Sequence, residues 1–151
     1  MPIHAPNINS YRRLFATWDA PKNTKWGIGN RSCGFRIPSN EEYGMRIENR
    51  ISGSDTNPYL VFAANLAAGY LGIKNKTKPT EASKKSVFNE KKSSLPKNME
   101  EAISMFEKDE QINEVFSQKF VRTIAAIRKV EYQAYLKVIS SWEREYLLLN
   151  V

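Results

Sequence analysis

The stretch MRIENRISGSDTNPYLVFAANLAAGYLGIKNK, residues 45–76, contains the change from strand-like to helix-like patterning that decides the fold class. After Gly53, Asp55 or Asn57 is a candidate N-cap residue, and Pro58 suits the first turn of a helix. The apolar residues that follow recur at helical spacing: Leu60, Ala63, Ala64, Ala67, Ala68 and Leu71. We therefore expect a buried helix of about four turns here.

Residues 23–51 carry the alternation of apolar and polar residues that is typical of short strands. The apolar positions form three groups: Thr24, Trp26 and Ile28; Cys33, Phe35 and Ile37; Met45, Ile47 and Ile51. We expect three short antiparallel strands followed by helices, which is an α+β fold. The alternation also predicts a row of polar side chains on one face of the sheet, namely Arg36, Arg46, Glu48 and Arg50.

Helix signals return after residue 97, whereas residues 1–22, with three prolines, read as an extended segment and loop. Asn98 is a candidate N-cap with Glu101 at the capping-box position, and Asp109 is expected to start a short helix that ends at Val115. A long amphipathic helix is predicted from about Ser117 to Trp142. Its expected apolar stripe is Phe120, Ile124, Ile127, Val130, Tyr135, Val138 and Ile139.

The charge of the chain is concentrated in two segments. The 151 residues have a formal net charge of +7, and residues 1–50 hold eight Lys and Arg, six of them Arg, against four acids. Residues 74–97 hold eight Lys against Glu81 and Glu90, in a Ser-, Asn- and Pro-containing stretch that reads as a solvated loop. We expect no nucleic-acid partner, although such a role for the lysine loop is the alternative.

A single cysteine, Cys33, excludes an internal disulfide, and with His4 as the single histidine no Cys/His cluster exists to bind zinc. We expect Cys33 in the core and His4 at the surface of the terminus. Neither a signal-peptide pattern nor a membrane-spanning stretch is found. A soluble, cytoplasmic protein is the expectation.

Three segments resemble motifs of glutamine synthetases, in the family's order and at about its spacing. NINSYRRLFATWDAP at 7–21 resembles NSYKRL…AP, and GNRSCGFRIP at 29–38 resembles NRSAxxRIP. Residues 45–76 resemble RRIExRxPGADANPYLxxAAxLAAGLxGIxNK. The ending ISSWEREYLLLNV is similar to that of the branch that includes γ-glutamyl-polyamine (putrescine) synthetases.

The resemblance implies an ATP-dependent ligase that joins ammonia or a primary amine to the γ-carboxylate of glutamate through γ-glutamyl phosphate, with Mg²⁺ or Mn²⁺ as cofactor. Arginine forks suit carboxylate and phosphate. By resemblance, Arg13 and Arg50 hold the glutamate carboxylates, Arg31 and Arg36 face the transferred phosphoryl group and ATP, Arg46 contacts the nucleotide phosphates and Glu48 is a metal ligand.

Asp19 stands where the family's flap carries a glutamate that binds and deprotonates ammonium. The shorter carboxylate, together with FAT where the family has VPG, favours a polyamine or another primary amine over ammonium. Asp19 and Arg31 are thus the predicted catalytic residues.

Simpler interpretations exist for several of these residues. Arginines on a half-exposed sheet are often solvated or salt-bridged. Tyr11, Trp18 and Trp26 are candidate stacking platforms for a nucleotide, but packing in the core or a loop is the favoured interpretation.

The resemblance covers the C-terminal portion of the family's catalytic domain, with a loop and strand region at 1–56 and a helical region at 57–151. The family's N-terminal β-grasp domain, most of its metal-binding glutamates and its histidine-containing motif precede this portion and are not found here. We expect the isolated chain to be inactive and to need the missing N-terminal portion, with the complete enzyme a homo-oligomer. The alternative is a non-catalytic remnant or interaction module from a split or truncated gene.

Overall fold

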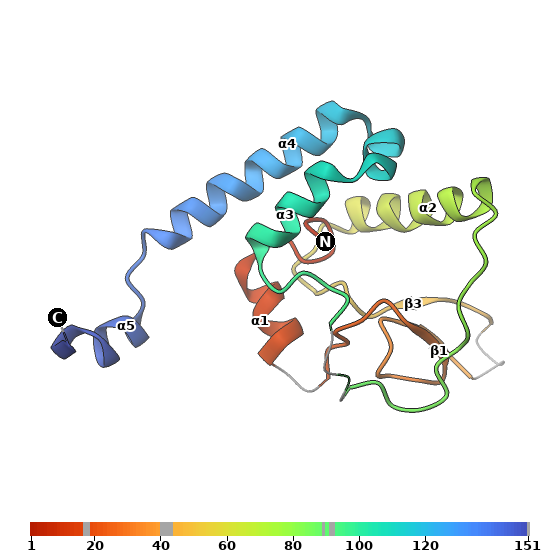
Figure 1. Cartoon of the computed structure of the whole chain (residues 1–151), viewed down its shortest axis with the longest axis horizontal. Coiled ribbons are helices and arrows are strands. Elements are labelled where there is room, and N and C mark those ends of the chain that lie inside the picture. Colours follow the sequence, from red (N-terminus) through yellow and green to blue (C-terminus); the bar gives the residue numbers. More distant parts are fainter. Residues whose placement is uncertain (17–18, 40–43, 89, 91–92, 151) are drawn as a thin grey trace.

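A computed structural model of the chain describes residues 1–16, 19–39, 44–88, 90 and 93–150. It combines one small sheet with several helices (Figure 1), and so confirms the α+β class. Helices α3 and α4 run side by side, α2 lies over the sheet, and α5 stands apart at the C-terminal end. No helix in the described part of the chain is both long enough and apolar enough to cross a membrane.

The N-terminal segment contains a helix that the sequence pattern did not predict, α1 (Ile8–Ala16). Asn7 starts it, because its side-chain oxygen accepts hydrogen bonds from the backbone N–H of Asn9 (2.9 Å) and Ser10 (3.2 Å). Tyr11 and Leu14 are buried on its inner face. The expectation of an extended segment was therefore wrong for residues 8–16, because the prolines lie outside the helix.

The sheet has the strand order β1 (Trp26–Ile28), β2 (Phe35–Ile37) and β3 (Glu48–Asn49). The pair β2–β3 is antiparallel as predicted, but β1 and β2 are parallel. Gly29, at φ 64°, turns the chain after β1. The buried Asn23 then holds the return loop, because it donates to the Ser32 carbonyl (3.0 Å) and accepts from the Gly34 N–H (3.2 Å). Cys33 is fully buried in this loop, as expected.

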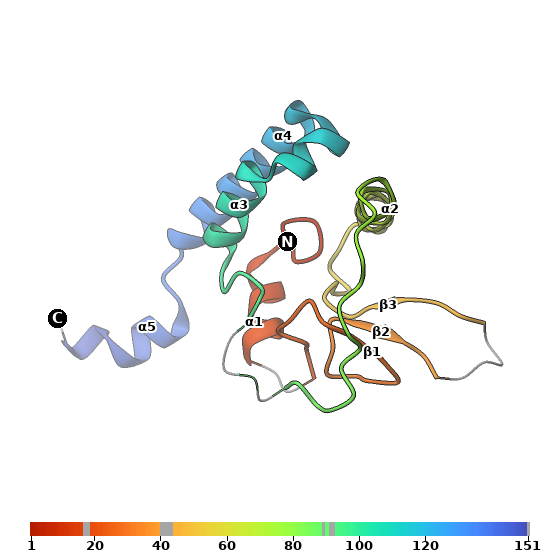
Figure 2. The same ribbon diagram turned by 45° about the vertical axis from the view of Figure 1, so that its right-hand side comes forward.

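Helix α2 (Pro58–Lys74) forms where the sequence predicted it, with Asn57 as the N-cap. All 17 of its residues are described and none is buried, so the prediction of a buried helix was wrong. Its large apolar side chains are 58–83% exposed: Tyr59, Phe62, Leu66, Tyr70 and Ile73. Figure 2 shows α2 end-on, with the sheet below it and α3 and α4 to one side. A helix that is apolar on all sides is typical of a buried position.

Helix α3 (Met99–Lys108) is capped by Asn98, which accepts from the Glu101 N–H at 2.8 Å, as predicted. The Glu101 carboxylate accepts from the Lys97 N–H (2.8 Å), one residue before the position of a standard capping box. Met99, Ala102, Ile103 and Phe106 form its buried face.

Helix α4 (Glu110–Leu136) starts at the predicted cap Asp109 and is kinked at Ser117, which has φ 66°. The two predicted helices are therefore joined at this kink. The second ends at Leu136 rather than near Trp142, because Ser140 caps a separate helix, α5 (Ser141–Tyr146), with a full capping box. A short 3₁₀ turn, η2 (Leu148–Asn150), follows.

The predicted stripe of α4 is only partly buried. Of the predicted residues Ile124 is buried, next to Val121 and Ala125, which the prediction did not include. Ile127 and Val130 are exposed, and so are Val138 and Ile139, which lie beyond the end of α4. The prediction of an apolar buried stripe was therefore wrong for these exposed residues. The buried residues of α4 all lie within 121–125, and the core does not extend to its C-terminal end.

The core lies between α1, α3 and the buried half of α4. One cluster includes Ala5, Tyr11, Leu14, Ile51, Met99, Ile103 and Ala125. A second contains Ile3, Phe106, Val121 and Ile124. The core therefore packs α1 and Ile51, which lie on either side of the sheet in the sequence, against α3 and α4.

Candidate active site

The predicted polar row begins with a pair across two strands. Arg36 on β2 and Glu48 on β3 are register partners, and Nη1 of Arg36 lies 3.0 Å from Oε2 of Glu48. Arg50 follows β3, and its backbone N–H donates to the Gly34 carbonyl (2.9 Å), which continues the β2–β3 pairing. Arg46, before β3, is exposed. The alternation in the sequence predicted that Arg36 and Glu48 share a face of the sheet, but not that they pair.

Arg13 and Arg50 converge from separate elements. The Arg13 guanidinium, on α1, donates to the Ile51 carbonyl directly after Arg50. Burial lowers the pKa of Arg13, the negative charge of Asp55 raises it, and the positive charge of Arg50 lowers it further. Two cations and one carboxylate therefore lie within electrostatic reach of one another.

Asp19 is joined to this cluster through its backbone. Nη2 of Arg50 donates to the Asp19 carbonyl oxygen at 3.2 Å, and the Asp19 side chain is exposed. The segment that precedes Asp19 lies outside the described residues. Arg50 thus links the predicted flap position to the end of β3.

Three residues support this cluster, and the sequence motifs did not assign them a role. The buried Ser10 donates its hydroxyl proton to Oδ2 of Asp55 at 2.6 Å. A Cβ on Gly53 would lie 2.4 Å from Oδ1 of Asp55 and 3.3 Å from Nε of Arg13, so any larger residue would displace the Asp55 carboxylate. Ser10 lies in the same sequence motif as Arg13 (residues 7–21), and this neighbourhood was the one signal in the sequence that could have indicated its role.

Two guanidinium nitrogens on the row have unused donor capacity. Nε of Arg36 and Nη1 of Arg50 are buried and have no hydrogen-bond partner among the described residues. A buried donor left unsatisfied costs about 1–3 kcal/mol. A bound carboxylate or phosphate oxygen would recover that free energy, so the row is chemically suited to an anion.

Arg31 occupies the turn between β1 and β2, and its side chain is exposed. Its two neighbours are fixed by hydrogen bonds: Oδ1 of Asn30 accepts from the Ser32 N–H (3.0 Å) and from the Ser32 hydroxyl (2.6 Å). The turn is therefore ordered although the arginine itself is open to solvent.

The residues with simpler interpretations have structural roles. Tyr11 is buried in the core, where burial raises the pKa of its phenol against the opposing charge of Arg128. Nε1 of Trp26 donates to the Thr80 carbonyl (2.8 Å), so Trp26 packs under a loop. Trp18 lies outside the described residues. His4 is not at the surface as expected, since it is half-buried and Nδ1 lies 2.8 Å from the Ser52 hydroxyl.

Residues 1–147 match the family model described as the catalytic domain of glutamine synthetase. The chain belongs to the glutamine synthetase catalytic-domain family. It is 37% identical to glutamate–isopropylamine ligase of a Pseudomonas species over 93% of its length and 31% of that protein. It is 29% identical to γ-glutamylputrescine synthetase PuuA of Escherichia coli, over 99% of this chain and 32% of PuuA. These matches confirm the family and the similarity to the amine-ligating branch.

The solved structures of GmaS share the fold of this chain. A GmaS/ADP complex superposes with a TM-score of 0.82 and is 30% identical, over 97% of this chain and 35% of GmaS. GmaS without ligand gives a TM-score of 0.81 at 28% identity. The chain spans about a third of the length of the relatives that it matches.

The family implies a divalent metal, and the described part of this chain does not by itself build a site for one. Glu48 offers a hard oxygen ligand of the kind that Mg²⁺ and Mn²⁺ prefer. Among the described residues, however, no group of three or more His, Cys, Asp or Glu is arranged to hold a metal ion. Glu48 is instead paired with Arg36. The described residues therefore supply one carboxylate and not a complete metal site.

Proposed function

We propose that this chain is the C-terminal part of the catalytic domain of an ATP-dependent ligase that joins an amine to the γ-carboxylate of glutamate. The observation that carries this proposal is the convergence of Arg13 and Arg50, from α1 and from the end of β3, next to the Arg36–Glu48 pair. Glutamate has two carboxylates, and two half-buried guanidinium groups can bind them with fixed geometry. The family match supports the same assignment.

The remaining arginines are suited to the phosphoryl group of ATP. Phosphoryl transfer depends on holding the phosphate oxygens and neutralising the charge that develops on them. In this proposal Arg31 and Arg36 face the transferred group, and Arg46 contacts the nucleotide phosphates. The buried Nε of Arg36, which has no hydrogen-bond partner among the described residues, would then donate to a phosphate oxygen.

Glu48 is proposed as one oxygen ligand of a metal that the complete enzyme binds with carboxylates from outside this chain. When bound, Mg²⁺ or Mn²⁺ would neutralise phosphate charge. Until then the Glu48 carboxylate is paired with Arg36. The complete enzyme thus requires the N-terminal portion of the domain, and we propose that it is a homo-oligomer.

Asp19 is proposed to choose the amine and to accept its proton. Its backbone is held by Arg50, which binds glutamate in this proposal, so its side chain lies near the acyl phosphate. Aspartate is one methylene shorter than the family's glutamate, which leaves about 1.5 Å of extra room for an alkyl group. Two relatives are named for alkylamines, isopropylamine and putrescine. A primary alkylamine is therefore the proposed substrate.

The test is a reconstitution of the chain with the N-terminal segment of a family member that ends where this chain's match begins. Ligase turnover with glutamate, ATP and either ammonium, isopropylamine or putrescine is expected. Asp19→Glu should shift the ratio of kcat/KM toward ammonium by about tenfold, and Asp19→Asn should slow all amines because the base is lost. A ratio that stays within about twofold in Asp19→Glu would remove Asp19 as the selector.

The second candidate function is a non-catalytic interaction module, and the exposed apolar side chains of α2 favour it. The same reconstitution separates the two. An assembled complex that binds ATP and glutamate but never releases ADP with any amine would support the module and exclude the ligase.

A further inference from the structure

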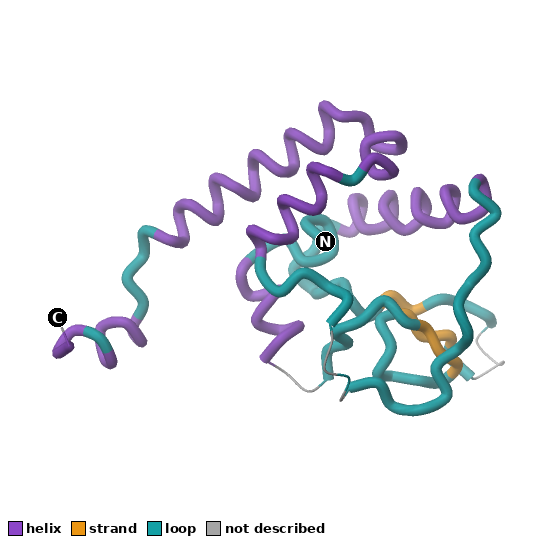
Figure 3. The backbone as a smooth tube through the Cα atoms, in the orientation of Figure 1, coloured by secondary structure: helices purple, strands orange, loops and turns teal. Residues whose placement is uncertain are grey.

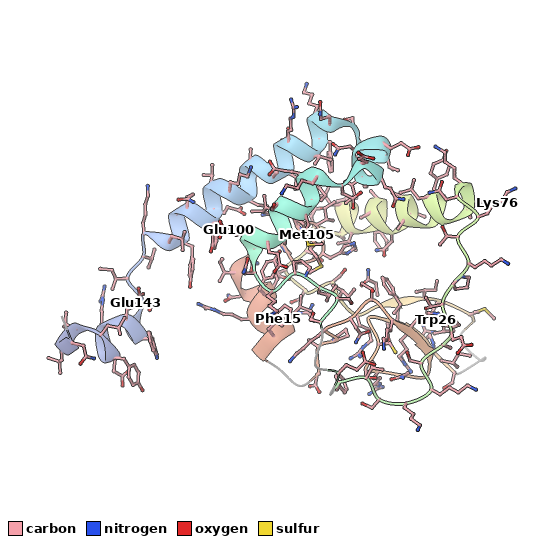
Figure 4. All side chains as sticks on the ribbon, in the orientation of Figure 1. Phe15, Trp26, Lys76, Glu100, Met105 and Glu143 are labelled. Carbon is pink, nitrogen blue, oxygen red and sulfur yellow. The ribbon has the colours of Figure 1, made fainter. Side chains whose placement is uncertain are left out.

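The lysine-rich loop after α2 returns across the sheet and lies against β1 (Figures 1 and 3). Its side chains are largely exposed, as the composition predicts, but its backbone is not free. The Ser83 N–H donates to the Trp26 carbonyl (2.8 Å), and the Trp26 indole N–H donates to the Thr80 carbonyl (2.8 Å). Figure 4 labels Trp26 beside this loop. Residues 80–87, which we term the strap, are thus bonded to the outer edge of β1.

A second set of hydrogen bonds ties the strap to the turn that carries Arg31. Nδ2 of Asn30 donates to the carbonyls of Ser83 (2.8 Å) and Lys85 (2.9 Å). The Val87 N–H donates to the hydroxyl oxygen of Ser32 (2.9 Å). Asn30 and Ser32 flank Arg31 and are bonded to each other, so both neighbours of Arg31 are held by the strap.

Gly27 makes this close contact possible. A Cβ at residue 27 would lie 2.7 Å from the Ser83 carbonyl oxygen and 2.9 Å from Cβ of Asn30. The strap and the turn therefore approach β1 at a position where only glycine fits. The contact is built into the fold rather than made by surface side chains alone.

The composition of the strap suits a neighbour of a phosphate-binding arginine. The strap contains Lys84 and Lys85 and one acid, Glu81, so its formal net charge is positive. The two lysines add positive potential near Arg31, which suits a phosphate. An exposed arginine has about 2 kcal/mol of rotamer entropy, so fixing its backbone from both sides restricts where the guanidinium can reach.

We propose that the strap positions Arg31 for phosphoryl transfer and that Asn30 is the positioning residue that couples the two. This inference rests on the proposed function, in which Arg31 faces the transferred phosphoryl group. In this proposal Asn30 itself contacts none of the three substrates, ATP, glutamate and the amine. It acts by fixing the turn, and a misplacement of about 1 Å in a catalytic group can cost about 100-fold in rate.

Asn30→Asp is the test variant, because it keeps the acceptor for Ser32 and removes both donors to the strap. Asn30→Ala also removes the donors but adds no charge beside Arg31, and it should give the same results. Ser94→Ala is the matched control: Ser94 accepts from the Thr24 N–H (2.9 Å), so it also joins the loop to the strand region, but away from Arg31. On the full chain, amide exchange at Ser83 and Val87 should accelerate at least tenfold in Asn30→Asp and remain near wild type in Ser94→Ala. Unchanged exchange in Asn30→Asp would overturn the coupling.

In the reconstituted ligase, Asn30→Asp should lower kcat at least tenfold with KM for glutamate within about twofold, and Ser94→Ala should not. The decisive readout is a double-mutant cycle with Arg31→Ala. If Asn30 acts through Arg31, adding Asn30→Asp to Arg31→Ala causes no further loss. A merely structural role would give additive losses and overturn the inference. An inactive wild-type complex would refute the proposed function, and this inference with it, whereas an active complex with unchanged Asn30→Asp would refute the inference alone.

Discussion

The exposed apolar side chains of α2 predict that the isolated chain associates with itself, and that two substitutions weaken this association. Phe62 and Leu66 are 68% and 75% exposed. Full burial of such a side chain contributes about 1.5–3 kcal/mol, so each has about 1–2 kcal/mol still to gain. Phe62→Gln with Leu66→Gln, both compatible with a helix, should remove about 2–4 kcal/mol of association free energy. That corresponds to a dissociation constant about 30- to 700-fold higher.

Sedimentation velocity over a range of micromolar concentrations measures this association. The wild-type chain should sediment as oligomers that dissociate on dilution, and the double variant should be mainly monomeric. Met45→Gln is the matched control, because Met45 is 93% exposed but lies outside α2. A wild-type chain that is a monomer throughout, or a double variant that associates as strongly, would refute the reasoning.

Three further predictions follow from the site and its surroundings. Gly53→Ala should destabilise the chain by about 1–3 kcal/mol in urea unfolding, because the new Cβ displaces Asp55 from Arg13. The same variant should raise the KM for glutamate of the reconstituted ligase. The control is Gly69→Ala, whose Cβ meets no atom within 4 Å and which should be neutral or stabilising. Burial, and next the charge of the amino terminus, lower the pKa of His4 from 6.5 to about 4, so below pH 6.5 the unfolded chain takes up a proton that the folded chain does not. His4 alone should therefore lower the stability by about 2 kcal/mol between pH 7 and pH 5, and a slope that persists unchanged in His4→Gln would contradict this. The isolated chain should release no ADP from ATP, glutamate and amines above a no-enzyme control, because it supplies one predicted metal carboxylate.

Local signals in the sequence were sufficient for several parts of the site. The N-caps Asn98 and Asp109 were predictable, and Asn57 was one of two candidates, because capping depends on residues three positions apart. The common face of Arg36 and Glu48 was predictable from strand alternation, which fixes the face of each side chain, whereas their pairing depends on the register of β2 and β3. The family followed from three motifs in order, and the family match confirms it.

Two features of the fold, helix α1 and the parallel pairing of β1 and β2, depend on residues far away in the sequence and were not predictable from local signals. The α1 helix is stabilised by packing of Tyr11 and Leu14 against residues near position 100, which local propensity does not report. The parallel pairing of β1 and β2 depends on the loop that Asn23 holds, and alternation is the same for both pairings.

The sequence by itself determined the family, the α+β class, the helix caps and the polar face of the strands, because each is set by residues close along the chain. Only the tertiary structure decided which polar and charged side chains contact one another. Ser10 and Asp55 are 45 positions apart and lie 2.6 Å from each other, and the lysine-rich segment binds the Arg31 turn from more than 50 positions away. The tertiary structure also left α2 exposed although its composition is that of a buried helix. The physical reason is that periodicity defines the surface that an element offers, whereas contact depends on which distant surface the rest of the chain brings against it.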